Sequence, residues 1–268
     1  MISAGQTLTQ VDLNGNTRWT YYTTGSLNYC RVGIFQGEET VVCGGFDYTL
    51  TYLDPNGKFT LPKKIVKAPV YALEILQSDK LLVGAGKTVM IFEPPQKQAT
   101  WTKVMPTVIK CAQTSLNSFY IGDLSGMIRK YSLEGELTWE KHLEGSPQTI
   151  AVYDPSDADS DLFVGLSNGA ILCLSSEGEL KWLVIRRWQP ISTVTSFQMP
   201  GMVARQVLVT TLEGAIILLD ETGGLIADLD ITGAISSARF NTVGSSEYTF
   251  FLGTYQGEIL LLKFVHKT

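Results

Sequence analysis

Short apolar runs, broken by polar turns, recur along the whole chain. Residues 71–76 and 162–165 are almost continuously apolar, whereas residues 7–13 alternate between polar and apolar side chains. Continuous runs are typical of strands buried on both faces, and alternation is typical of strands with one exposed face. No window carries an apolar stripe with helical period, and Gly, Pro and β-branched residues interrupt every candidate helix. The pattern therefore predicts an all-β protein.

A repeat of about forty residues underlies this pattern. Residues 126–139 (GMIRKYSLEGELTW) align without gaps with residues 169–182 (GAILCLSSEGELKW), and the first glycine precedes the tryptophan by the same distance in both. The same frame begins at positions 6, 48, 87, 126, 169, 214 and 257. Each repeat divides into four short strands, which we name a to d in chain order. This is the size and content of one blade of a β-propeller.

Glycines mark the tight turns between strands c and d of the repeats. Gly15, Gly57, Gly135 and Gly178 each follow a polar residue at the expected turn. A two-residue hairpin turn needs positive φ, which glycine adopts without steric cost. We therefore expect consecutive strands to pair as antiparallel hairpins.

The repeats predict one domain over residues 1–268, a single β-propeller of four-stranded antiparallel blades. Six a strands favour six blades; seven would need two incomplete blades, or a chain cut from a longer protein. The chain enters at the end of a b strand and residues 6–22 supply strands c and d, whereas residues 234–265 supply only a, b and c. We expect the N- and C-terminal strands to close the ring, because closure removes two exposed strand edges.

The pattern Gly-x-Ile, followed by Gly-x-Leu-x-Trp seven residues later, resembles the repeat of quinoprotein-like (PQQ-type) propellers, which are related in shape to WD40 propellers. The resemblance covers essentially the whole chain and implies a propeller fold. Enzymes of that family use a calcium-held quinone, often with a vicinal cysteine pair, and generally have eight repeats. This chain has no adjacent cysteines and fewer repeats. We therefore expect a non-catalytic member without a cofactor.

Charge and composition narrow the function further. The chain carries 21 Lys+Arg against 26 Asp+Glu, a net charge of −5, which argues against nucleic acid as the main partner. It has two histidines and four cysteines without C-x-x-C spacing, so a histidine-based metal site or catalytic triad is not expected. The first residues do not resemble a signal peptide, and the apolar runs are too short to span a bilayer. These features predict a non-enzymatic, cytoplasmic protein that does not insert into membranes.

The cysteines are expected to be small buried side chains. Cys30, Cys43, Cys111 and Cys173 each lie in an apolar stretch. Cys30 and Cys43 flank the turn at Gln36-Gly37, so they could face each other across a hairpin as a reduced or a redox-sensitive pair.

Four tryptophans recur with the repeat and one does not. Trp19, Trp101, Trp139 and Trp182 end the repeat pattern, which predicts that they pack between adjacent blades. Trp188 lies instead in a loop directly after Arg186 and Arg187. It is a candidate binding residue, with the alternative that it folds down over the edge of the ring.

An acidic cluster precedes one b strand. Asp154, Asp157, Asp159 and Asp161 resemble the calcium loop of FG-GAP propellers, but two ligand positions of that loop would fall on Tyr153 and Pro155. We expect a solvated turn and no metal, and keep a Ca²⁺ loop as the alternative.

Together these features predict a protein–protein interaction scaffold or a subunit of a larger assembly. In a propeller the d–a and b–c loops emerge on the same face, which makes that face the expected binding surface. Arg and Trp are enriched at interface hot spots, and lysines speed the approach of an acidic partner. The alternative is a quinoprotein-like propeller that binds a small ligand or a glycan. The predicted partner-binding residues are Lys63, Lys64, Lys67, Arg186, Arg187 and Trp188.

Overall fold

The computed structural model describes residues 1–12, 15–76, 79–96, 98–154, 156–157, 159–198, 204–243 and 247–264. Over these ranges the regular structure is entirely β, which confirms the all-β prediction. No helix in the described part of the chain could cross a membrane.

The chain divides into two compact units, which are described separately. Unit 1 comprises residues 1–114 and 133–136, and unit 2 comprises residues 115–132 and 137–268. Whether the whole chain acts as one domain stays a prediction.

The strands of unit 1 are β1 Ile2–Ala4, β2 Thr7–Val11, β3 Thr17–Tyr22, β4 Leu27–Phe35, β5 Glu38–Gly45, β6 Thr49–Leu53, β7 Phe59–Ile65, β8 Val70–Leu76, β9 Lys80–Ala85, β10 Thr88–Phe92, β11 Ala99–Val104 and β12 Ile109–Thr114. Those of unit 2 are β13 Ser118–Asp123, β14 Met127–Ser132, β15 Leu137–His142, β16 Pro147–Val152, β17 Leu162–Leu166, β18 Ala170–Leu174, β19 Leu180–Ile185, β20 Ile191–Phe197, β21 Gln206–Thr211, β22 Ala215–Leu219, β23 Leu225–Asp230, β24 Ile235–Val243, β25 Glu247–Thr254 and β26 Ile259–Phe264.

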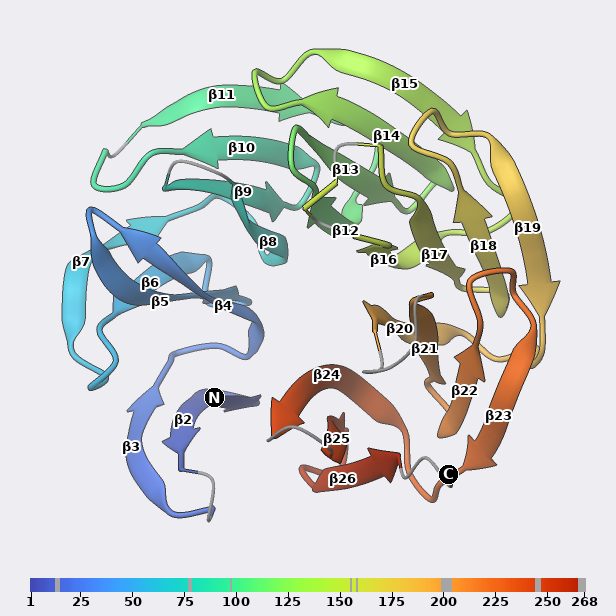
Figure 1. Ribbon diagram of the computed structural model, residues 1–268. Helices are drawn as coiled ribbons and strands as arrows, with labels where there is room; N and C mark the ends of the chain where they lie inside the picture. Colours follow the sequence, from blue (N-terminus) through green and yellow to red (C-terminus); the bar gives the residue numbers. More distant parts are fainter. Residues whose placement is uncertain are drawn as a thin grey trace. The chain divides into compact units, whose positions relative to one another are not determined.

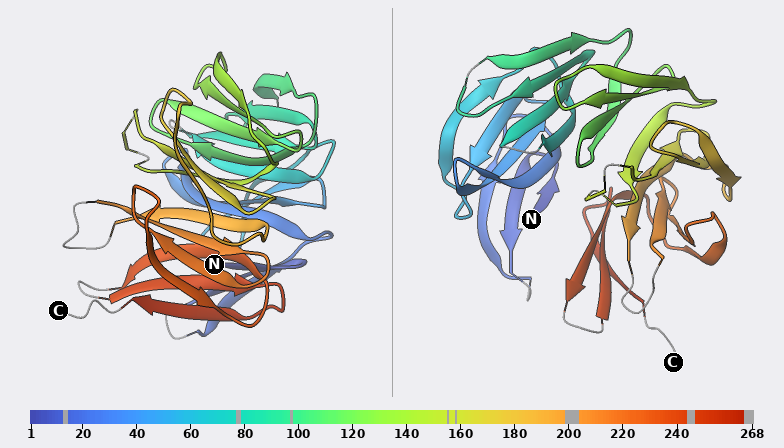
Figure 2. Two further views of the ribbon diagram at one scale, coloured as in Figure 1. Left: turned by 90° about the vertical axis from the view of Figure 1, so that its right-hand side faces the viewer. Right: turned by 45° about the horizontal axis from the view of Figure 1, so that its top comes forward.

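The sheets follow the predicted blades. Five have four strands in chain order, namely β4–β7, β8–β11, β12–β15, β16–β19 and β20–β23. The chain begins with a three-stranded sheet, β1–β3, and ends with another, β24–β26. Figure 1 shows the strands of each sheet running side by side, and Figure 2 shows their twist from two further directions. The six predicted a strands are β4, β8, β12, β16, β20 and β24.

The start of the chain agrees with the sequence prediction. The sequence predicts that the chain enters at the end of a b strand and then supplies strands c and d, and β1 pairs with β2 at the position of that b strand. Closure of one blade by both termini stays a prediction.

The core lies between neighbouring sheets. In unit 1, Val42 and Leu50 pack with Leu73 and Val83 of the following sheet. In unit 2, one cluster joins β16–β19 to β20–β23 through Phe163 and similar residues, and a second joins β20–β23 to β24–β26. These side chains are fully buried, and each contributes about 1.5–3 kcal/mol through burial. Central strands are therefore apolar on both faces.

The periodic tryptophans form the outer contacts between successive sheets. The indole Nε1 of Trp19 donates to the carbonyl of Pro55, that of Trp139 to Ser176, and that of Trp182 to Glu221, over 2.8, 2.8 and 2.9 Å. Each acceptor lies in the c–d turn of the next sheet. The prediction that these tryptophans pack between blades is confirmed.

Four c–d turn glycines each lie against the tryptophan of the preceding sheet, namely Gly57, Gly135, Gly178 and Gly223. Gly178 has φ of +82°, and a Cβ there would lie 3.0 Å from the ring of Trp139. At Gly135 a Cβ would lie 2.1 Å from Nε1 of Trp101. The glycine thus serves two needs, a positive φ for the hairpin and space for a flat ring. This explains why the two residue types recur together in the repeat.

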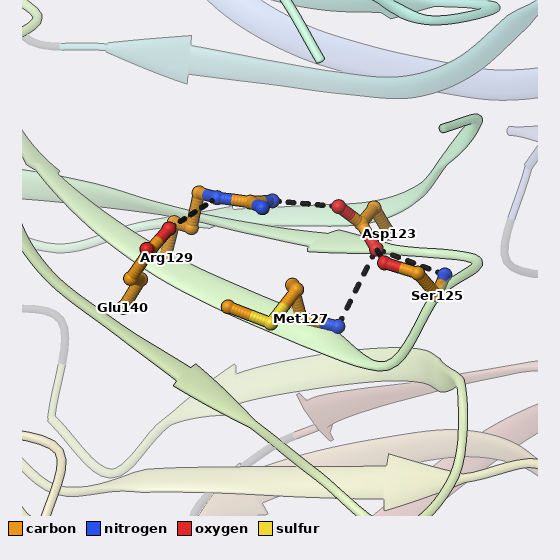
Figure 3. A network of polar contacts seen from close by, with 5 residues as sticks. All are labelled: Asp123, Ser125, Met127, Arg129 and Glu140. Carbon is orange, nitrogen blue, oxygen red and sulfur yellow. Dashed lines mark hydrogen bonds and ion pairs between the residues drawn. The ribbon is translucent and has the colours of Figure 1, made fainter. Parts of the chain in front are cut away.

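Figure 3 shows a buried polar network within β13–β15. The Arg129 guanidinium donates to Asp123 over 2.6 Å and to Glu140 over 3.0 Å. Asp123 also accepts hydrogen bonds from the Ser125 hydroxyl and from backbone N–H groups, at distances down to 2.6 Å. Burial alone would raise the pKa of Asp123, but the hydrogen bonds from Ser125 and Arg129 outweigh it and lower the pKa. The network therefore fixes the β13–β14 turn through an ionised carboxylate.

Candidate interaction surface

The connection between β19 and β20, residues 186–190, presents the most exposed large apolar side chain in the described part of the chain. We call this segment the Trp188 loop. Trp188 is 81% exposed, so the alternative that it folds down as a cap is wrong. An indole in water with no packing partner is the kind of side chain that becomes an interface anchor.

Backbone contacts fix the Trp188 loop in place. A Cβ on Gly169, which has φ of +87°, would lie 2.2 Å from the carbonyl oxygen of Arg187, so the loop passes directly over that glycine. On its other side, the Pro190 carbonyl accepts from the Leu212 N–H over 3.0 Å, and the Gln189 side chain accepts from Thr211 over 2.8 Å. The loop is therefore tied to the b–c turns of two successive sheets. Its order lowers the entropy cost of binding a partner.

Arg187 ties the same loop to β23. Its Nη2 donates to Asp228 over 3.0 Å and to Asp230 over 3.2 Å, and the hydrogen bond to Asp228 raises the pKa of the guanidinium. Two carboxylates thus surround one cation. The sequence predicts Arg187 to be a partner-binding residue, and the structure shows its guanidinium paired with two carboxylates of β23. Arg186 stays exposed, and its nearest acceptor is the Gly223 carbonyl at 3.4 Å.

Two further exposed apolar residues of unit 2 occupy b–c turns. Leu124 is 52% exposed between β13 and β14, and Tyr255 is 67% exposed between β25 and β26. Because strand direction alternates within each sheet, b–c turns and d–a loops emerge at the same end of a sheet. Neither residue is among those predicted from the sequence. The available signal was their shared position, two residues before the repeat glycine.

The predicted lysines lie elsewhere than expected. Lys63 and Lys64 belong to strand β7 and not to the following loop, and only Lys67 lies in that loop, where it is exposed. The Lys63 ammonium sits 5.5 Å from the ring centre of Tyr21, and that of Lys64 sits 5.1 Å from the ring centre of Phe92. The loop placement is wrong because β7 continues to Ile65, past Pro62. That these lysines share a face with the Trp188 loop stays a prediction.

Two of the four aspartates of the acidic cluster are paired with cations. Asp161 pairs with Lys181 over 2.6 Å, and Asp154 pairs with Arg205 over 3.2 Å. Hydrogen bonds from Ser156 lower the pKa of Asp154. Asp157 accepts from the backbone N–H of Asp159 over 3.0 Å. Among the described residues, no group of three or more His, Cys, Asp or Glu side chains could hold a metal ion. The calcium alternative stays a hypothesis for experiment.

The cysteines are free thiols. Cys30 and Cys43 stand directly opposite each other in the β4–β5 register, which confirms the predicted juxtaposition. A hydrogen bond to Cys30 and burial raise the pKa of Cys43, and burial raises the pKa of Cys173 to about 12. Both thiols therefore stay protonated at neutral pH and are poor nucleophiles.

Comparisons with known proteins are informative at the level of structure only. No protein-family profile matches the chain, and no curated protein matches it in sequence. BBS1N, solved in complex with ARL6DN, superposes with a TM-score of 0.73 at 13% identity, over 94% of this chain and 82% of that one. U3-55K superposes with a TM-score of 0.77 at 12% identity, over 93% of this chain and 82% of that one.

The chain has a β-propeller fold. With the six a strands and the antiparallel four-stranded sheets, this confirms the predicted all-β, six-bladed propeller. The finer resemblance to quinoprotein-like propellers stays a hypothesis.

Proposed function

We propose that this propeller is a non-enzymatic interaction module that binds a protein partner through the Trp188 loop. The observation that carries the proposal is an 81% exposed indole on a loop that is held by hydrogen bonds to Pro190 and Gln189 and by the ion pairs of Arg187 with two carboxylates. Ordered exposed aromatics with an adjacent arginine have the composition of an interface hot spot. BBS1N, a structure with the same fold, was solved with a protein partner, ARL6DN.

Further residues of unit 2 would complete the binding surface. Leu124 and Tyr255 would extend the apolar contact along the b–c turns, and Arg186 would face an acidic part of the partner. Arg187 would hold the loop and contribute little free charge, because Asp228 and Asp230 already neutralise it. We place the protein in the cytoplasm, as a scaffold or a subunit of a larger assembly.

The proposal is tested by a pull-down that compares the proteins bound by the parent protein with those bound by Trp188→Ala. Tyr22→Ala is the matched control, since Tyr22 is a similarly exposed aromatic (73%) on β3. A partner captured by the parent and by the control should be lost from Trp188→Ala. With the purified partner, the dissociation constant should rise about thirtyfold, the equivalent of about 2 kcal/mol for a hot-spot residue. Equal affinity for parent and Trp188→Ala would refute the assignment of this surface.

A further inference from the structure

The tryptophan of the repeat is missing at one sheet junction of unit 1. In the register of each c–d hairpin, Trp19 stands opposite Gln10 and Trp101 opposite Ile91; the corresponding residue of β7 is Leu61, opposite Tyr52. The next sheet nevertheless presents its c–d turn, which here contains Pro94 and Pro95 in place of a glycine hairpin. Leucine is too short to reach this turn as an indole does.

A groove lies where the indoles of Trp19 and Trp101 meet the following c–d turn at the other junctions of unit 1. It has a volume of about 330 Å³ and is lined by β7 and the turn after β10, including Tyr52, Leu61, Lys64, Pro94, Pro95 and Gln96. This volume lies at the lower end of the range of ligand pockets, which suits a single large side chain better than a cofactor. The walls are apolar, because the buried Tyr52 ring, Leu61 and two prolines supply them.

The rim of the groove is cationic. Lys63 and Lys64 both line it, and neither forms an ion pair with a carboxylate in the described part of the chain. The neighbouring Glu93 is already paired with Lys80 over 3.0 Å, so it does not neutralise them. The Lys64 ammonium lies over the ring of Phe92, on the side of the following sheet that forms the groove, whereas the Lys63 ammonium lies over Tyr21 of β3 and Phe59 of β7. An entering ligand therefore meets apolar walls with the Lys64 charge beside them, and Lys63 lies at the outer edge of the groove.

We propose that this groove binds a segment of a protein partner that presents one tryptophan flanked by acidic residues. The partner indole would take the place that the repeat leaves vacant at Leu61, and a flanking carboxylate would pair with Lys64, with Lys63 available at the edge of the groove. The complementarity is thus one of shape, from the missing side chain, and of charge, from Lys64 and the neighbouring Lys63. The groove belongs to unit 1 and the Trp188 loop to unit 2, so the groove adds a second contact to the proposed function.

The test uses a fluorescein-labelled, end-blocked peptide of sequence Asp-Glu-Trp-Glu-Asp, titrated by fluorescence anisotropy. Leu61→Trp is the decisive variant, because it restores the side chain of the repeat and fills the groove. We expect Leu61→Trp to bind the peptide at least about tenfold more weakly than the parent protein does. We expect the same loss when the parent protein is titrated with a peptide in which alanine replaces the tryptophan. The double variant Lys63→Ala/Lys64→Ala should weaken binding several-fold, and this loss should shrink between about 0.05 and about 0.5 M salt because screening weakens surface charge pairs.

Two control variants distinguish peptide binding in this groove from binding elsewhere on the protein. Lys103→Ala removes the lysine that follows Trp101 as Lys63 follows Leu61, at a junction whose tryptophan is present, and should leave peptide binding unchanged. Trp188→Ala should also bind the peptide as the parent does, which separates this proposal from the proposed function. Thermal unfolding checks that Leu61→Trp is folded; should it fail to fold, the lysine variants carry the test.

Equal peptide affinity for the parent, a folded Leu61→Trp and the lysine double variant would overturn the proposal, as would absence of parent binding at about 1 mM peptide. Analytical ultracentrifugation gives a further test. If the parent protein forms a dimer and Leu61→Trp does not, the groove binds a second copy of this chain, and the proposal is overturned.

Discussion

The contact between Trp139 and the next sheet is the sharpest test of how the blades are held together. Replacing Trp139 with alanine removes the indole from Gly178 and from the ring of Tyr120, whose centre lies 6.0 Å away. It also removes the 2.8 Å hydrogen bond from Nε1 to the Ser176 carbonyl. Because neighbouring repeats contribute to stability mainly through their shared interface, the loss acts directly on one junction.

The expected loss of unfolding free energy in Trp139→Ala follows from these contacts. A buried Trp→Ala substitution costs about 3–5 kcal/mol, and the partial exposure of Trp139 favours the lower figure, about 3 kcal/mol. The hydrogen bond accounts for about 1 kcal/mol of this. At about 2–4 °C per kcal/mol for a protein of this size, the melting temperature should fall by about 6–12 °C. Trp139→Phe, which keeps a ring and loses only the N–H and some area, should cost about 1 kcal/mol.

Thermal unfolding followed by circular dichroism measures the effect, with urea unfolding as a second determination. Trp188→Ala is the matched control, since an exposed indole should change stability by no more than about 0.5 kcal/mol. Gly178→Ala should destabilise through the same contact, because its φ is +82° and its Cβ would press on the Trp139 ring. Trp139→Ala and Trp188→Ala melting at the same temperature would refute the assignment of periodic tryptophans to blade contacts.

Three further predictions concern pH, the chain ends and calcium. The folded pKa of Asp123 is lowered, so its stabilisation should be present above about pH 4 and be lost as pH falls through the folded pKa; unfolding curves of Asp123→Asn should lack this acid-dependent loss. Deleting residues 1–22 should lower the melting temperature by more than Trp19→Ala alone if the terminal strands close a blade, and an equal effect would argue against closure. Millimolar Ca²⁺ should barely shift the melting temperature, because Lys181 and Arg205 already engage two of the aspartates; a large shift abolished by Asp157→Ala would support the calcium loop.

The sequence by itself determined the blade architecture, because its signals are local. A glycine such as Gly178 is needed wherever a hairpin requires positive φ, and alternating or continuous apolar runs report which faces of a strand are buried. These requirements repeat with every blade, so comparison of one repeat with the next shows them. The same periodicity identified Trp139 and its equivalents as structural and set Trp188 apart.

Only the tertiary structure decided which charged side chains are paired and where a groove remains between the strands. Arg187 is neutralised by residues 41 and 43 positions away, and Asp154 is paired with Arg205 on a distant segment. The groove at Leu61 lies between β7, which carries leucine where the repeat has tryptophan, and a turn more than thirty residues later in the chain. No local rule encodes such contacts, since their energies depend on which side chains the packed sheets bring within a few ångströms of each other.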